Sequence, residues 1–236
     1  MQDFLVKSVC FGGAFAVLSL GLLYTFQDKM LYLPGTPIRH IRDNPRGYRS
    51  PTERSITYQS VRLEVPDSEQ DFLHGWHMYH ENSETDTAQN PDGSERNTVI
   101  FFHENAGNLG LRMDYFSMLY HDMGFNVISF AYRGYSDSVL KIGSPNEDVL
   151  KQDARVIVDY CKQNFSEQSL FLVGRSLGGA VATYAASLEP LMFDGLVLEN
   201  TFTSIADMVD TMFYFVGYFK FFILRIGWDT KLLLAS

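Results

Sequence analysis

A sharp turn between a strand and a helix is the feature that most constrains the fold of this 236-residue chain. An apolar run of strand character, residues 169–173, leads into Gly174-Arg-Ser-Leu-Gly178, and an Ala-rich run of helical character follows. In this context G-x-S-x-G is typical of a nucleophile elbow, in which the serine stands at the tip of a strained turn. The flanking glycines let strand and helix pass closely because they carry no side chain. The sequence therefore predicts that Ser176 holds its hydroxyl above a sheet; the alternative is an ordinary glycine-rich turn.

Composition narrows the class of protein. The chain is 46% hydrophobic and 14% aromatic, which suits one α/β domain of ordinary size. A net charge of −9 argues against nucleic acid as a partner, because phosphate binding needs a basic face. Cys10 and Cys161 provide neither a disulfide framework nor metal-ligand spacing. We expect no cofactor and no metal.

The N-terminus contains nineteen consecutive uncharged residues, 8–26. As a helix this run would be about 28 Å long, enough to cross a hydrocarbon core. A cleaved signal peptide and a buried core helix are the alternatives. The favoured organisation is a transmembrane anchor over residues 1–30, a connector over 31–51 and a domain over 52–236. The side of the membrane is left open, because flanking basic residues favour a cytosolic domain while Asn164-Phe-Ser would be a glycosylation sequon in a lumenal one.

After the connector, strand-like and helix-like segments alternate. We expect strands near residues 55–65, 72–79, 98–102, 126–132, 169–174 and 195–199, and helices near 111–123, 146–164 and after Ser176. The first two strands look antiparallel, and the later alternation implies a mostly parallel sheet with helices on both faces. The loops at the carboxyl ends of such strands build a site.

The aromatic segment Met212–Leu224 stands apart from this pattern. Its thirteen residues include one charge, Lys220, and are too few for a membrane span. We expect a buried or interfacial helix that helps to line an acyl pocket.

A serine in acyl transfer needs a base, an acid that orients the base, and two amides that face the oxyanion. The backbone N–H of Leu177, at the start of the helix after Ser176, is the first amide. The loop after the third strand, residues 103–108, supplies the second, and Asn105 is its expected donor. His103 lies in this loop, and the family resemblance described next implies that its role there is structural.

Five motifs then occur in order: His103–Gly110, Tyr132–Tyr135, Gly143–Pro145, Gly174–Ala180 and Leu198–Ser204. Together they resemble membrane-anchored serine hydrolases of the alpha/beta-hydrolase domain-containing protein 13 type, which are more distantly similar to protein depalmitoylases. The resemblance implies an α/β-hydrolase fold, an endomembrane location such as the endoplasmic reticulum, and hydrolysis of an ester or thioester in a lipid or acylated protein. It implies Ser176 as the nucleophile, with Leu177 and Asn105 as the oxyanion-hole amides.

The chain departs from the family pattern at three places. Glu104 replaces a glycine beside the oxyanion site, where a charge would oppose an oxyanion unless it points away or is protonated. The loop 136–142 is longer than in the family. The family's acid and histidine after the serine are absent, so we expect a truncated domain that lacks the last two strands and is inactive or nearly so. The alternative is a non-catalytic, membrane-tethered binding or scaffold protein.

Overall fold

The computed structural model describes residues 2–66, 68–80, 97–165, 169–212 and 217–235; within the first helix, side chains are described at residue 11 and from residue 17 onward. Its described strands form a six-stranded sheet in the order β1-β2-β4-β3-β5-β6. The strands are β1 (Tyr58–Glu64), β2 (Phe72–Met78), β3 (Thr98–Phe102), β4 (Asn126–Phe130), β5 (Leu170–Arg175) and β6 (Gly195–Glu199). β2 is antiparallel to β1 and β4, whereas β4, β3, β5 and β6 run parallel. The expected α/β-hydrolase sheet is confirmed.

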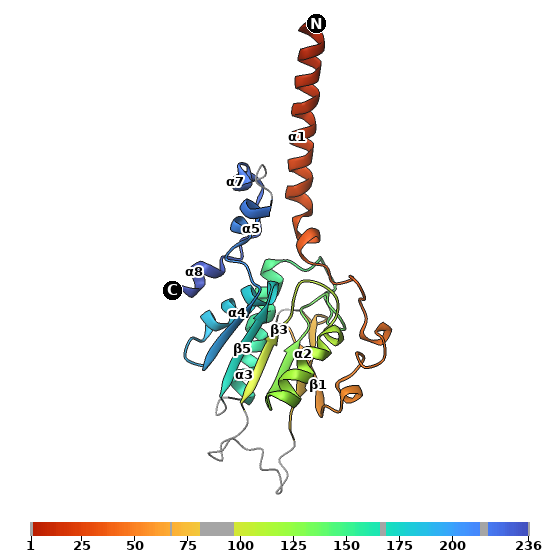
Figure 1. The fold of residues 1–236 in the computed structure, drawn as a ribbon, viewed down its shortest axis with the longest axis vertical. Helices are drawn as coiled ribbons and strands as arrows, with labels where there is room; N and C mark the ends of the chain where they lie inside the picture. The colour runs from red at the N-terminus through yellow and green to blue at the C-terminus, as the bar shows by residue number, and fades with distance from the viewer. Residues whose placement is uncertain (1, 67, 81–96, 166–168, 213–216, 236) are drawn as a thin grey trace.

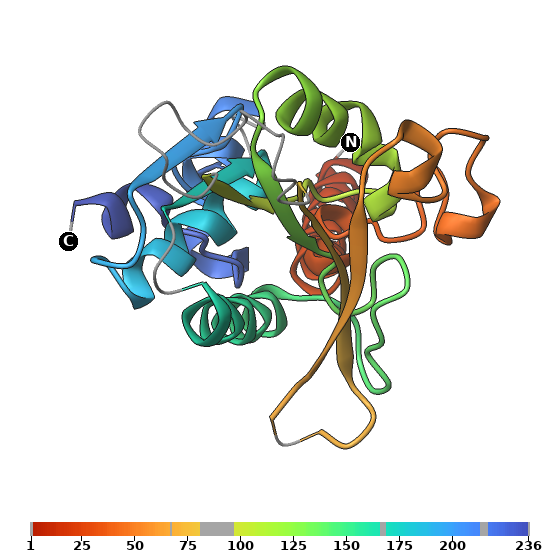
Figure 2. The same cartoon turned by 90° about the horizontal axis from the view of Figure 1, so that it is seen from below.

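Alternation along the central strands divides the core into two layers. Ile100 and Phe102 of β3 pack in one cluster with the buried residues of α3 (Glu147–Asn164) and α4 (Leu177–Leu188). Val99 and Phe101 point to the other face and pack with Phe116 of α2 (Met113–Ser117). Figure 2 shows α2 and α3 on opposite sides of the sheet. This follows from the period of two along a strand, which sends neighbouring side chains to opposite faces.

The helices match the sequence expectations with one difference. The helix expected over 111–123 is a short 3₁₀ turn at Leu109–Arg112, then α2, then a π-helical turn at Met118–Asp122. The helix expected over 146–164 is α3. The Asn146 side chain caps it by accepting a hydrogen bond from the backbone N–H of Val149 at 3.0 Å.

The N-terminal helix α1 (Gln2–Leu31) projects away from the sheet domain, with its first residue at the far tip (Figure 1). It contains the whole uncharged run of residues 8–26. Within the part of the chain that the structure describes, no helix is both long and apolar enough to cross a membrane.

The residues that follow α1 pack firmly on the domain. Tyr32 is buried, and its hydroxyl accepts a 2.8 Å hydrogen bond from the Trp228 indole N–H. Asn44 and Asn108 exchange two buried side-chain hydrogen bonds of 2.8 Å each. The segment expected as a connector therefore holds α1 in a defined place against the sheet domain.

The chain ends in short helices on the same side as α1. These are α5 (Ile205–Met212), α7 (Lys220–Ile223) and α8 (Thr230–Leu234). α5 and α7 rise beside α1 (Figure 1), whereas α8 packs against α4. Glu147 of α3 secures the end of the segment by accepting hydrogen bonds from the backbone N–H groups of Gly227 and Trp228, at 2.7 and 3.2 Å.

Candidate active site

Ser176 occupies the turn between β5 and α4 in a conformation that L-residues rarely adopt. Its φ and ψ angles are +53° and −120°. The turn is held by backbone contacts: the Ser176 N–H donates to the Glu199 carbonyl at 2.9 Å, and the Ser176 carbonyl accepts from the Gly179 N–H at 2.9 Å. The Thr201 hydroxyl donates to the same carbonyl at 2.8 Å. A strained residue fixed by its neighbours is what the elbow motif predicts.

Two glycines make this turn sterically feasible. A Cβ atom at Gly174 would lie 2.3 Å from the carbonyl oxygen of Gly178. A Cβ atom at Gly178 would lie 2.0 Å from the carbonyl oxygen of Phe102, at the end of β3. Real Cβ atoms do not approach backbone atoms this closely, so the elbow requires glycine at both positions.

Ser176 opens into an apolar pocket with a cavity volume of about 440 Å³. Leu177 and Asn105 line the same pocket, so the three residues expected from the sequence to form one site lie together. The remaining lining residues come from α1, the loop after β6, α5 and residues 223–226: Leu23, Gln27, Met30, Leu31, Phe202, Ile205, Met208, Val209, Met212, Ile223, Leu224 and Ile226. The aromatic C-terminal segment thus contributes to the pocket, as expected, while the contribution of α1 was not foreseen.

The two expected amide donors differ in how they are held. Leu177 is the first residue of α4, where backbone N–H groups have no partner within the helix and the helix dipole favours negative charge. Asn105 is held by the last residue of α1 and by the segment that follows it. The Asn105 side-chain N–H₂ donates to the Leu31 carbonyl at 2.8 Å, and the Asn105 carbonyl accepts from the Leu33 N–H at 2.8 Å. Those contacts involve the side chain and the carbonyl of Asn105 and not its backbone N–H.

His103 is engaged in holding the loop. Its Nδ1 lies 2.7 Å from the Glu104 carbonyl oxygen, and its Nε2 accepts a 3.2 Å hydrogen bond from the Tyr132 N–H. The ring is buried against the Tyr132 ring, with the two centroids 4.0 Å apart. Burial, together with the positive charge of Arg112, lowers the pKa of His103 to about 3. Both ring nitrogens of this neutral histidine are used, which supports the structural role expected from the sequence.

The Glu104 carboxylate is neutralised by two arginines. Its oxygens lie 2.5 Å from Nε of Arg112 and 3.5 Å from Nε of Arg175, and Arg175 also pairs with Glu199 at 3.4 Å. Burial lowers the pKa of the Arg112 guanidinium, and the Glu104 carboxylate opposes that shift. Glu104 is not among the pocket-lining residues. Its charge is therefore paired with arginines, and it ties the Asn105 loop to Arg175, the residue before Ser176.

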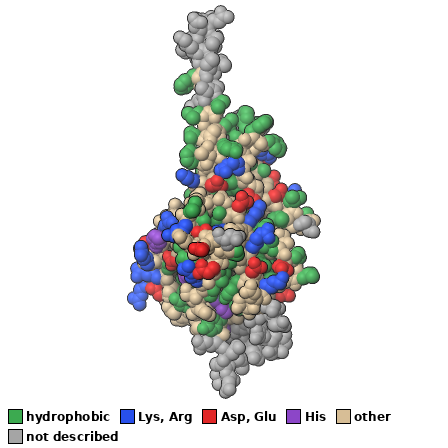
Figure 3. All heavy atoms as spheres, turned by 180° about the vertical axis from the view of Figure 1, so that it is seen from behind, with side chains coloured by type: hydrophobic (Ala, Val, Ile, Leu, Met, Phe, Trp, Pro, Cys, Tyr) green, Lys and Arg blue, Asp and Glu red, His purple; other side chains and the backbone are tan. Residues whose placement is uncertain are grey.

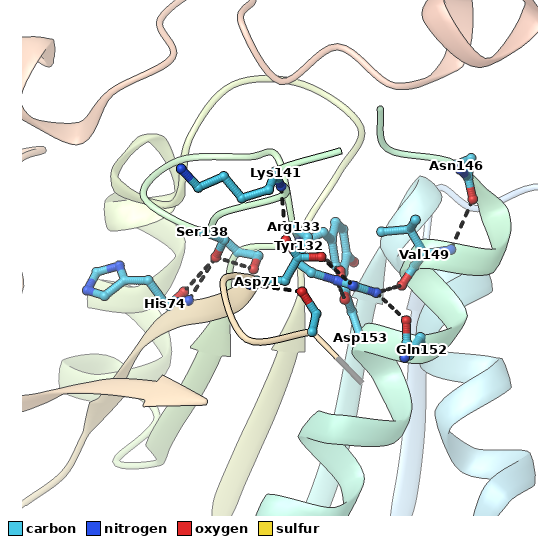
Figure 4. A network of polar contacts seen from close by, with 12 residues as sticks. Asp71, His74, Tyr132, Arg133, Ser138, Lys141, Asn146, Val149, Gln152 and Asp153 are labelled. Atoms are coloured by element: carbon cyan, nitrogen blue, oxygen red, sulfur yellow. Dashed lines mark hydrogen bonds and ion pairs between the residues drawn. The ribbon is translucent and has the colours of Figure 1, made fainter. Parts of the chain in front are cut away.

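A second charged cluster stabilises the loop after β4 (Figure 4). Arg133 is buried and pairs with Asp153 of α3 at 2.5 Å and with Asp71 at 3.2 Å. Asp71 also accepts a 2.9 Å hydrogen bond from the Lys141 N–H. Burial raises the pKa of Asp153 to about 6, although Arg133 acts to lower it. Arg133 lies in the motif Tyr132–Tyr135, but no sequence signal identifies its two acidic partners, Asp71 and Asp153, which are 62 and 20 residues away along the chain.

Comparison with known proteins places this geometry in context. Residues 93–226 match the family described as serine aminopeptidase, S33. The chain is 32% identical to protein bem46 of Schizosaccharomyces pombe over 206 residues, which cover 86% of this chain and 63% of that protein. It is 31% identical to the uncharacterized membrane protein YNL320W of Saccharomyces cerevisiae, covering 98% of this chain and 75% of that protein. It is 34% identical over 136 residues to lysophosphatidylserine lipase ABHD12 of Xenopus tropicalis, covering 53% of this chain and 34% of that lipase.

Proposed function

Because this chain belongs to the serine aminopeptidase S33 family of α/β-hydrolases, we propose that it hydrolyses acyl ester or thioester bonds with Ser176 as the nucleophile. One observation carries the proposal: Ser176, Leu177 and Asn105 line a single apolar pocket. The strained backbone of Ser176 supports it, because such strain is a recurring property of nucleophiles on elbows.

The reaction would follow the acyl-transfer pattern. The Ser176 oxygen loses its proton to a base and attacks the acyl carbon, and the N–H groups of Leu177 and Asn105 stabilise the resulting oxyanion. The alkoxide or thiolate leaves with a proton, and water then hydrolyses the acyl-serine. No histidine lines the pocket, and all six histidines of residues 1–236 precede Ser176. The proposal therefore assigns the nucleophile and the oxyanion donors and leaves the base unassigned.

The pocket supports a fatty acyl chain as the part of the substrate that is bound. Its lining is dominated by Leu, Ile, Met and Val side chains, which favour hydrocarbon over sugar or peptide groups. Similarity to a protein named lysophosphatidylserine lipase supports a lipid with one acyl chain, and an acylated protein would present the same group.

We also propose that the run 8–26 within α1 anchors the chain by a single span in an endomembrane. The support is its length, its lack of charge and the projection of α1 from the domain (Figure 1). Similarity over most of this chain to a yeast protein named as a membrane protein adds to that support.

A second candidate is a membrane-tethered protein that binds acyl groups without turnover and keeps the elbow as a scaffold. This candidate is favoured because both ring nitrogens of His103, the histidine of the Asn105 loop, have hydrogen-bond partners, so His103 is unable to act as a base in this arrangement.

A fluorophosphonate probe separates the two candidates. For the hydrolase we expect covalent labelling of the protein that is abolished by Ser176→Ala, and release of fatty acid from a long-chain monoacyl ester. Labelling that survives Ser176→Ala would exclude Ser176 as the nucleophile. For the binding protein we expect neither labelling nor release, with long-chain fatty acid binding that is equal in the wild type and Ser176→Ala.

A further inference from the structure

Exposed apolar side chains lie on the elements that line the pocket. On α7, Phe221 and Phe222 are 87% and 81% exposed. We define the apolar rim as these exposed residues together with their exposed neighbours on α1, α5 and the turn before α7: Leu18, Leu22, Met30, Met212, Tyr218 and Phe219. Figure 3 shows hydrophobic side chains gathered at the end of the molecule from which α1 projects. An exposed group of this kind marks a binding surface rather than ordinary surface composition.

The pocket opens within this rim. Met30 of α1 and Met212 of α5 both line the pocket, and yet they are 56% and 64% exposed. A residue that borders a cavity and also faces solvent stands at its entrance. An acyl chain that reaches Ser176 between α1 and α5 therefore passes the apolar rim first.

Hydrogen bonds and an ion pair define the position of α7 along α1. The Gln27 side-chain amide donates to the Ile223 carbonyl at 2.9 Å, and its oxygen accepts from the Arg225 N–H at 2.8 Å. The Arg225 guanidinium pairs with Asp28 at 2.7 Å. These contacts hold α7 level with residues 27 and 28, directly after the uncharged run of α1 ends at Phe26. If the run occupies the hydrocarbon core, α7 lies at the boundary between hydrocarbon and headgroups.

The residues of the rim suit that boundary. Tyr side chains are enriched where the hydrocarbon meets the headgroups, and Phe and Leu side chains form the buried face of helices that lie in this interface. The charges next to them are largely paired, since Arg225 pairs with Asp28 and Lys220 pairs with Asp210. A surface of aromatic side chains with paired charges binds lipid by burying apolar area and needs no anionic headgroup.

We propose that the apolar rim docks on a neutral lipid surface, so that the pocket mouth opens into the bilayer and an acyl chain enters without crossing water. The acyl-chain part of this proposal rests on the proposed function, whereas the docking surface does not require turnover.

The test places a fluorophore on the rim of the full chain. Phe222→Cys in a Cys10→Ser background is labelled with an environment-sensitive nitrobenzoxadiazole dye, and Cys161 is retained because it is buried. The control is Met123→Cys, an apolar position that is also exposed (55%, against 81% for Phe222) and that precedes β4. Met123 lies at the amino ends of the parallel strands, whereas Ser176 lies at their carboxyl ends. Both proteins are mixed with phosphatidylcholine vesicles, with and without bromine on the acyl chains.

We expect the dye at position 222 to shift to the blue and to lose most of its emission in brominated vesicles, at low and high salt alike. The dye at position 123 should do neither. Emission at 222 that is insensitive to brominated lipid overturns the proposal, and a blue shift without bromine quenching assigns the rim to a protein contact instead.

Two further readouts keep this result separate from the other proposals. Quenching at position 222 should persist with Ser176→Ala, so failure of the hydrolase proposal leaves the docking result standing.

Washing the vesicles with alkaline carbonate tests the anchor. A chain that resists the wash while its dye at position 222 is unquenched has an anchor but no docking rim. A quenched dye on a chain that the wash removes supports the rim without a spanning helix.

Discussion

The elbow and the pocket walls, two regions that meet at Ser176, are stabilised in different ways. The elbow is held by backbone hydrogen bonds and by close contact of Gly178 with β3, inside the core of the sheet domain. The walls are helices that stand above the domain and are joined across the pocket by Gln27 and Arg225. Changes at the elbow should therefore act mainly on folding, whereas changes at the walls should act on ligand binding.

Gly178→Ala should have the largest effect, on the elbow side of this comparison. Its Cβ atom would lie 2.0 Å from a backbone oxygen of the central strand β3, which has little freedom to move. We expect a loss of about 3 kcal/mol or more in the free energy of unfolding, measured by urea denaturation. Gly35→Ala is the control, because nothing lies within 4 Å of its Cβ position. Equal stability of the two variants would contradict the packing described for the elbow.

Glu104→Gln tests the link between the elbow and the Asn105 loop. Removing this carboxylate leaves the largely buried Arg112 without its charged partner. We expect the free energy of unfolding, measured by urea denaturation, to fall by about 2 kcal/mol, which is less than for a fully buried pair because both side chains are partly exposed. Glu189→Gln, which breaks an exposed pair with Lys162, should have no measurable effect. If Glu104→Gln instead increased fluorophosphonate labelling with no loss of stability, the carboxylate would be acting on the oxyanion site after all.

The pH dependence of folding should report His103. Its pKa is about 3 in the folded protein and about 6.5 when unfolded, so the unfolded state binds an extra proton between these values. The contribution of His103 is fully present above pH 6.5 and is lost as the pH falls toward 3. By pH 5 we expect a loss of about 2 kcal/mol relative to pH 8.

The check for this prediction is the slope of the unfolding free energy against pH. His103→Gln has no group that titrates in this range, so its slope between pH 6.5 and pH 5 should be flatter even if the variant is less stable throughout. An unchanged slope would mean that another group is responsible.

Gln27→Ala should have the smallest effect on folding and a selective effect on the pocket. It removes the hydrogen bonds that join α1 to Ile223 at the end of α7 and to Arg225 beyond it, each worth about 1 kcal/mol. We expect roughly tenfold weaker binding of a long-chain fatty acid, which corresponds to about 1.4 kcal/mol. Thr25→Val is the control, because the Thr25 hydroxyl bonds to the Gly21 carbonyl within the same helix. If Gln27→Ala lowered the stability of the protein without changing acyl binding, it would contradict the assignment of folding to the elbow and ligand binding to the pocket walls.

Much of the fold could be predicted from the sequence because its signals are local. The strands and helices around the sheet follow from periods of two and 3.6, and their observed bounds lie within a few residues of the expected ones. The helix expected over 111–123 was less regular than predicted, because periodicity identifies a helical face without distinguishing 3₁₀, α and π turns. The ion pairs of Arg133 were not predicted, because the local sequence around an acidic residue does not indicate which distant arginine it pairs with.

The sequence by itself determined the elbow, since the glycines, the strand before it and the helix after it are contiguous and their steric requirements are met within a few residues. Only the tertiary structure decided what surrounds Ser176. It directed Glu104 toward two arginines, and it brought Gln27 against Ile223, 196 residues away, to close the pocket. The physical reason is that a local motif specifies backbone angles, whereas the partner of a helix face depends on how all the layers of the domain pack together.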